Sequence, residues 1–181
     1  AVGYHSGLYL TTGIYNTLIG SGAGDALTDA DTNVAVGADA LTTDTKGSKN
    51  TAVGHSALEA QNFTTSTTSY NTAIGSDAGG AITTGVENTL IGSNAGDALT
   101  DADYNVAVGI SALSLDTLGS RSVAIGRMAL GNQNFTTATD AYNTAIGYSA
   151  GIQVTTGIQN TFIGGDAGDA TDDGAENVAV G

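Results

Sequence analysis

The sequence predicts an all-β fold, a parallel β-solenoid of about ten coils, and three observations predict it. First, the pattern Thr or Val, then Ala, Leu or Phe, then Ile or Val, then Gly recurs along the whole chain, usually after Asn. Second, the glycines of this motif follow a 17-residue period that is twice extended to a 21-residue one. Third, four coils form a 72-residue super-repeat, so that GDALTDAD occurs at 24–31 and again at 96–103. We therefore interpret residues 1–181 as a single β-solenoid.

The Ile or Val of the motif predicts the interior. We number each coil from its Asn, position 1, so that the motif glycine is position 5 and the Ile or Val is position 4. A β-branched residue at one fixed place per coil is typical of a strand that faces a continuous core. Position 3 would then point to the opposite side, where its apolar residues need a partner. The expected core residues are Ile19, Val36, Val53, Ile74, Ile91, Val108, Ile125, Ile146 and Ile163.

A second pattern, inside the coil, indicates close packing. Where position 9 is Gly, position 12 is usually a large apolar residue such as Leu27. Where position 9 is Leu41 or Leu113, position 12 is Asp44 or Asp116. We expect one large side chain to fill the same volume from either position.

Asn at position 1 and Gly at position 5 predict the turns around each strand. An Asn that opens a strand can bond to nearby backbone, and stacked Asn amides can form a ladder from coil to coil. Gly ends the strand by a positive φ or by close backbone approach. These structural positions include Asn16, Asn33, Asn50, Asn71, Asn88, Asn105, Asn143 and Asn160, with Gly20, Gly75 and Gly147.

The same motif resembles two groups of fibrous proteins. Two coils resemble repeats of phage tail-fibre and surface proteins, namely NTAIGSDAGGAITTGVE (71–87) and NTAIGYSAGIQVTTGIQ (143–159). A third segment, RSVAIGRMAL (121–130), is similar to the NSVAIG repeat of YadA-like heads of trimeric autotransporter adhesins. The resemblance covers the whole chain and implies a left-handed β-roll, three of which pack as a homotrimer. The coils are longer here than in the adhesin heads. Because the chain begins and ends within a repeat, we expect it to be a window of a longer fibre, and its end coils to allow end-to-end stacking.

The amino-acid composition makes several classes of binding partner unfavourable. The chain has 18 acidic and 4 basic residues, a net charge of −14, and no cysteine. Such a surface repels nucleic acid and anionic lipid, and the absence of cysteine excludes disulfides and thiolate metal sites. No apolar run approaches the ~20 residues of a membrane span, so we expect no membrane insertion of this segment. Two histidines and four basic residues are too few for a catalytic cleft, and we expect no enzyme.

The aspartates admit two interpretations. Asp25, Asp29 and Asp31 recur as Asp97, Asp101 and Asp103, and oxygen-rich loops of this kind can hold Ca²⁺. Their spacing matches neither the EF-hand nor the nonapeptide of calcium-binding β-rolls. The simpler interpretation is a solvated acidic turn that keeps the rod soluble. We expect no other cofactor.

The two 21-residue coils carry longer loops, at 61–70 and 133–142. Phe63, Tyr70, Phe135 and Tyr142 offer an aromatic surface for a sugar, a protein receptor or a neighbouring subunit. Two functions therefore follow. The first is a structural fibre, stalk or head segment of an extracellular adhesin, phage tail fibre or surface filament, on a cell surface or a virion. The alternative is a receptor- or glycan-binding module that acts through these loops.

Overall fold

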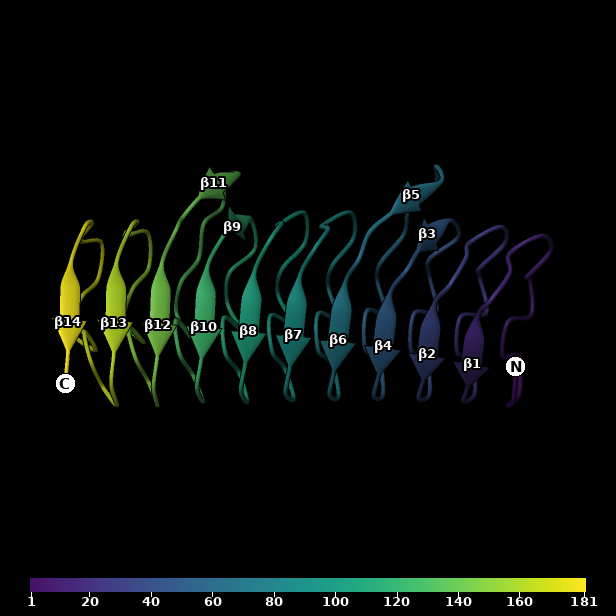
Figure 1. Ribbon diagram of the computed structural model, residues 1–181, viewed down its shortest axis with the longest axis horizontal. Helices are drawn as coiled ribbons and strands as arrows, with labels where there is room; N and C mark the ends of the chain where they lie inside the picture. Colours follow the sequence, from purple (N-terminus) through teal and green to yellow (C-terminus); the bar gives the residue numbers. More distant parts are fainter.

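The computed structural model describes all 181 residues and is a rod of stacked coils with the two termini at opposite ends (Figure 1). One three-residue strand per coil joins a ten-stranded sheet in the order β1-β2-β4-β6-β7-β8-β10-β12-β13-β14. These strands are β1 (Thr17–Ile19), β2 (Val34–Val36), β4 (Thr51–Val53), β6 (Thr72–Ile74), β7 (Thr89–Ile91), β8 (Val106–Val108), β10 (Val123–Ile125), β12 (Thr144–Ile146), β13 (Thr161–Ile163) and β14 (Val178–Val180). The chain forms no helix long and apolar enough to cross a membrane.

Two small sheets protrude from one edge of the rod (Figure 1). Each joins a 17-residue coil to the 21-residue coil that follows it. The four strands are β3 (Gly47–Ser48), β5 (Thr67–Thr68), β9 (Gly119–Ser120) and β11 (Thr139–Asp140), paired as β3 with β5 and β9 with β11. The inserted residues therefore extend each longer coil outward without disturbing the main sheet.

All neighbouring strands are parallel and in register. Leu18 pairs with Ala35, and Ala35 pairs with Ala52. The backbone bonds alternate in direction: Thr17 N–H donates to the Asn33 carbonyl at 2.8 Å, and Gly37 N–H donates to the Ile19 carbonyl at 2.8 Å. The predicted parallel solenoid of 17-residue coils is thus confirmed, with each coil rising about 4.8 Å above the last.

The predicted core residues, however, face outward, and this part of the sequence interpretation is wrong. In every strand from β1 to β13 of the main sheet the middle residue, position 3, is buried, while positions 2 and 4 are half-buried or exposed. The interior column is Leu18, Ala35, Ala52 and their equivalents. The residues that were expected inside and lie outside are Ile19, Val36, Val53, Ile74, Ile91, Val108, Ile125, Ile146 and Ile163.

The reason is the thin cross-section of the coil. Its interior holds mainly alanines, at positions 3 and 8, and few large side chains per coil. No coil has a large side chain at both position 3 and position 9: Leu18 faces Gly24, whereas Ala35 faces Leu41. A Cβ added to Gly24 would lie 2.8 Å from Leu18 Cδ2. Space inside the coil therefore excludes a column of Ile and Val, because those side chains would overfill it.

Gly at position 5 is required by the stacking itself. Gly75 has φ of +139°, and a Cβ there would lie 2.5 Å from the carbonyl oxygen of Gly92 in the next coil. The same close approach repeats along the rod. Any other residue would therefore push two coils apart.

Three further residues per coil adopt left-handed backbone, at positions 7 and 9 and at the last position. In the coil that begins at Asn33 these are Asp39, Leu41 and Lys49, with φ of +56°, +54° and +63°. For a residue other than Gly this conformation costs roughly 1–2 kcal/mol. Because it recurs along the rod, it belongs to the turns of the architecture and does not mark a particular site.

The Asn residues at position 1 form the ladder that the sequence suggested. The Asn33 side-chain oxygen accepts the N–H of Asn50 at 2.9 Å, and the same contact joins Asn71 to Asn88 at 2.9 Å. Most of these side-chain amides also donate within their own coil, as Asn33 does to the Gly47 carbonyl at 2.9 Å. The ladder ties the start of each strand to the neighbouring coils.

Candidate functional surfaces

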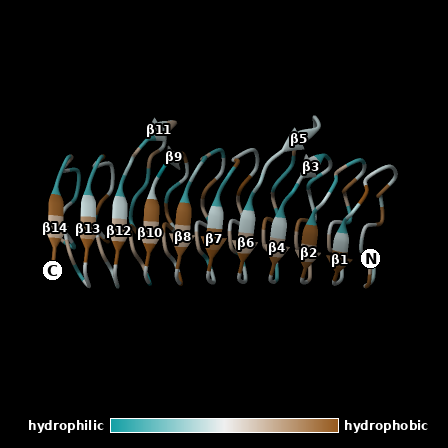
Figure 2. Cartoon of the chain, viewed as in Figure 1, coloured by the Kyte–Doolittle hydropathy of each residue, from teal (hydrophilic) through white to brown (hydrophobic).

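The outer face of the ten-stranded sheet, which we call the strand face and define as positions 2 and 4 of every coil, combines an unbroken column of Ile and Val at position 4 with a column of Thr and Val at position 2. Figure 2 shows these strands as a band of white and brown, with hydrophilic segments above their starts. Ile19, Ile91 and Ile163 are 44%, 37% and 41% exposed, although isoleucine is a residue type that proteins usually bury. The side chains are β-branched and stiff, so the face is a regular, rigid array. Exposed apolar side chains gathered on one face are typical of protein interfaces, so the strand face is a candidate interface.

The aromatic residues of the long loops divide into two groups. Phe63 and Phe135 are buried, at 7% and 5% exposure, so the expectation that they present a recognition surface is wrong. Their rings lie under the loop against Gly47 and Gly119, and a Cβ added to Gly47 would approach Phe63 Cδ2 to 2.9 Å. Only Tyr70 and Tyr142 of the four are exposed, each by about half. The phenylalanines therefore anchor the loops, because burial of an aromatic ring stabilises the insertion.

A buried carboxylate lies beneath each long loop, and the sequence interpretation did not predict it as a polar site. Asp44 is fully buried, and its Oδ1 accepts the N–H groups of Gly47 and Phe63, both at 3.0 Å. Its Oδ2 accepts Gln61 Nε2 at 2.6 Å. Gln61 Oε1 in turn accepts Asn71 Nδ2 at 2.8 Å. Three consecutive coils are thus joined through one Asp–Gln–Asn network.

The second super-repeat contains the same network with one difference. Asp116 accepts the N–H groups of Gly119 and Phe135 at 3.0 Å and Gln133 Nε2 at 2.5 Å, and Gln133 Oε1 accepts Asn143 Nδ2 at 2.8 Å. Here Ser122 replaces the position-1 Asn, and its hydroxyl accepts Gln133 Nε2 at 3.0 Å.

The difference at Ser122 has a local cause. In the first super-repeat the equivalent residue is Asn50, whose buried Nδ2 has no hydrogen-bond partner. In the 17-residue coils that amide donates to the carbonyl at position 15 of its own coil, a bond that Asn50 does not make in its 21-residue coil. Serine at position 122 has no such amide, and its hydroxyl oxygen has a partner in Gln133 Nε2.

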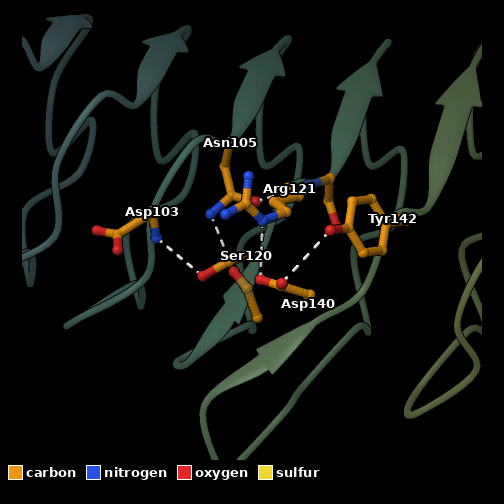
Figure 3. Close-up of polar contacts among 8 residues, drawn as sticks. Asp103, Asn105, Ser120, Arg121, Asp140 and Tyr142 are labelled. Atoms are coloured by element: carbon orange, nitrogen blue, oxygen red, sulfur yellow. Dashed lines mark hydrogen bonds and ion pairs between the residues drawn. The ribbon is translucent and has the colours of Figure 1, made fainter.

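Tyrosines and cations form a ladder along the loop edge of the rod. The Arg121 guanidinium lies 4.6 Å from the ring centre of Tyr104 and 5.9 Å from that of Tyr142. Its Nε contacts Asp140 Oδ1 at 2.9 Å (Figure 3), and the hydrogen bond to Asp140 raises the pKa of Arg121 above its ordinary value. In the first super-repeat Lys49 lies over Tyr70, at 5.1 Å. Sequence reasoning missed these pairs because they join residues from different coils.

The aspartates considered for calcium serve as hydrogen-bond acceptors, and the structure brings no three of them together in a group that could hold a metal ion. Asp31 Oδ1 accepts Ile14 N–H at 2.8 Å, and Asp103 Oδ1 accepts Val86 N–H at 2.8 Å. Asp25 and Asp101 accept threonine hydroxyls of neighbouring coils, Asp29 accepts the Thr28 hydroxyl, and Asp97 accepts an amide of Asn94. Most of these carboxylates thus bridge coils, which explains their recurrence.

The surface carries no pocket. The candidate functional features are therefore the strand face, the exposed tyrosines of the loop edge and the buried networks. Comparisons with known proteins gave no match: no family model fits the chain, and no curated protein or solved structure is similar enough to identify a relative. The likeness to tail-fibre and adhesin repeats stays a prediction.

Proposed function

We propose that this solenoid is a non-catalytic structural segment of an extracellular fibre, a stalk or head piece of an adhesin, phage tail fibre or surface filament. The observation that supports the proposal best is the strand face. It runs the length of the rod, repeats at each coil, and exposes Ile19, Ile91 and Ile163 to solvent in the isolated chain. No residue at positions 2 and 4 of the strands is charged, so a partner that covers this face needs an uncharged, largely apolar surface of its own.

The partner that fits this face is a second and third copy of the chain. Identical rods repeat at the same spacing, so their Ile and Val columns can interdigitate along the full length. Three copies around an axis would bury the strand faces together and leave the loop edges outward. The resemblance of the repeat to trimeric adhesin heads favours this homotrimer. An acidic, extended rod suits a cell surface or a virion.

Light scattering behind size exclusion tests the assembly. A trimer has three times the mass of the 17.8 kDa chain, and a stable monomer in solution would contradict the proposal. Ile91→Lys places a charge on the strand face and is expected to release monomers. Leu115→Lys is the matched control, because Leu115 is 52% exposed but lies away from the strand face. It should leave the oligomer intact.

The second candidate, recognition of a receptor or glycan through the long loops, is favoured by one observation. Tyr70 and Tyr142 are half exposed at equivalent places of the two super-repeats, about 19 Å apart by strand spacing. A glycan array separates the two functions. Binding that is lost in Tyr70→Ala and Tyr142→Ala, with the oligomer unchanged, would support the binding module.

A further inference from the structure

The two buried carboxylate–amide networks lie in a column that is otherwise apolar from Leu27 to Val154. Position 12 is Leu27 in the first coil, Asp44 in the second, Gln61 in the third and Ile82 in the fourth. All four side chains are buried. The pattern then repeats with Leu99, Asp116, Gln133 and Val154. We propose that these networks fix the order in which coils stack, so that a coil accepts its correct neighbour and rejects the others.

Most of the backbone stacking surface is common to all coils. The coils offer the same backbone bonds and the same close approach at the position-5 glycine, and the Asn ladder is interrupted only at Ser122. A coil could therefore skip a neighbour and still form most of these contacts. Coil-specific contacts at the surface, such as Thr42 with Asp25, remain in water, whereas in the interior a polar group must find a partner, and there only position 12 carries a charge.

The network has a direction, which makes it selective. A carboxylate only accepts hydrogen bonds, so Asp44 fixes the Gln61 amide with its nitrogen toward the carboxylate. The Gln61 oxygen then faces Asn71 Nδ2, and the Asn71 oxygen accepts Asn88 N–H at 2.9 Å. One acidic side chain thereby orients the polar groups of the next two coils.

Skipping one coil breaks this arrangement. If the coil at 50–70 stacked directly on the coil at 16–32, Gln61 would lie on Leu27. The Phe63 N–H and Gln61 Nε2 would then have no acceptor, and buried polar groups without partners are strongly unfavourable. A shift of four coils places Asp116 where Asp44 was and restores every partner. The 72-residue super-repeat is therefore the unit in which coils can be exchanged, within one chain or between copies.

Disulfide trapping tests the inference, because the chain has no cysteine of its own. Ser21, Ala38 and His55 occupy the same exposed position of three consecutive coils. Neighbouring coils bring Cα atoms to about 4.8 Å, within disulfide range, whereas coils two apart are about 9.6 Å away and out of range. The pair Ser21→Cys/His55→Cys therefore reports a skipped coil, and Ser21→Cys/Ala38→Cys reports correct stacking.

The decisive variant moves the carboxylate back by one coil, as Leu27→Asp with Asp44→Leu. We expect the disulfide yield of the Ser21/His55 pair to rise at least about tenfold over the native background. About tenfold is the change in the stacking equilibrium expected when one buried hydrogen-bond donor loses its acceptor. The yield of the Ser21/Ala38 pair should fall correspondingly. A folded variant with the native crosslinking pattern would overturn the inference, because a purely structural network would lower stability without changing which coils meet.

A milder variant decides the question if the first does not fold. Asp44→Asn keeps the shape but places an amide group against Gln61, so the direction of the network is lost. Asp29→Asn is the matched control, because Asp29 is exposed and takes no part in the network. A higher Ser21/His55 yield in Asp44→Asn than in Asp29→Asn supports the inference, and equal yields refute it.

Discussion

Exchanging the large side chain between positions 3 and 9 of one coil is the most direct test of how the interior is packed. In the second coil Ala35 faces Leu41, both fully buried, whereas in the first coil Leu18 faces Gly24. Ala35→Leu with Leu41→Gly converts the second coil to the pattern of the first. The exchange nearly conserves volume within the coil, so it isolates packing from composition.

The single changes should each be destabilising. Ala35→Leu overfills the coil beside Leu41 and should cost about 1–3 kcal/mol. Leu41→Gly leaves a cavity, which costs about 2–5 kcal/mol for a buried leucine, less about 1 kcal/mol because Gly relieves the left-handed backbone. The double variant restores a filled interior. We expect it to be at least about 2 kcal/mol more stable than the sum of the two single effects, within the range known for residues in contact.

Urea unfolding followed by circular dichroism measures the four free energies of the cycle. The control pairs Ala35→Leu with Leu113→Gly, the same residue types four coils apart, where no coupling is expected. If the first pair is additive within about 0.5 kcal/mol, as distant sites are, positions 3 and 9 do not share one volume and the packing argument fails.

Three other perturbations have defined outcomes. Gly75→Ala should destabilise the rod by at least about 2 kcal/mol in thermal unfolding, because Gly75 has a left-handed backbone and the added Cβ would meet the next coil. Gly165→Ala should be neutral, because nothing lies within 4 Å of the Cβ added there. Equal effects of the two variants would contradict this argument. Arg121→Ala should speed amide exchange in the loop at 136–140 without changing the melting temperature. Lys49→Ala should have a smaller effect on the loop at 64–68, because Lys49 makes no ion pair. Unchanged exchange in both loops would count against a stabilising role of the cation–tyrosine contacts. Adding a chelator should leave the melting midpoint unchanged, because the aspartates already accept hydrogen bonds; a lower midpoint would support calcium.

The repeat itself was sufficient to predict the coil length, the parallel stacking and the place of each strand. Side chains that recur with a 17-residue period can only lie above one another if the chain winds once per repeat, and Gly at a fixed place marks the end of each strand. The Asn ladder followed from the same reasoning. Those features depend on what is common to all coils, which is why one sequence reveals them without a structure.

The orientation of the strands could not be predicted in this way. A three-residue strand with Ile19 and Leu18 on opposite faces is apolar on both, so alternation does not say which face is inside. The larger β-branched residues suggested the wrong face. Phe63 was misplaced for a related reason, because an aromatic residue in a long loop is consistent with exposure until the loop is seen to fold over it.

The buried networks could be predicted from the sequence only in part. Asp44 followed one coil later by Gln61, and again Asp116 by Gln133, was a readable signal of paired polar residues. What it lacked was the knowledge that position 12 stays buried when it carries Asp or Gln. Without burial, an aspartate is most simply placed in a solvated turn.

Periodicity in the amino-acid sequence was thus enough to establish the coil length, the direction and the continuity of the rod, since these are properties of any chain that repeats. Periodicity could not tell which side chains fill the coil and which are left for a partner. That distinction required the tertiary structure. The cause is distance: two walls of one coil approach so closely that alanines and one or two larger side chains fill the space between them. The isoleucines are therefore turned outward.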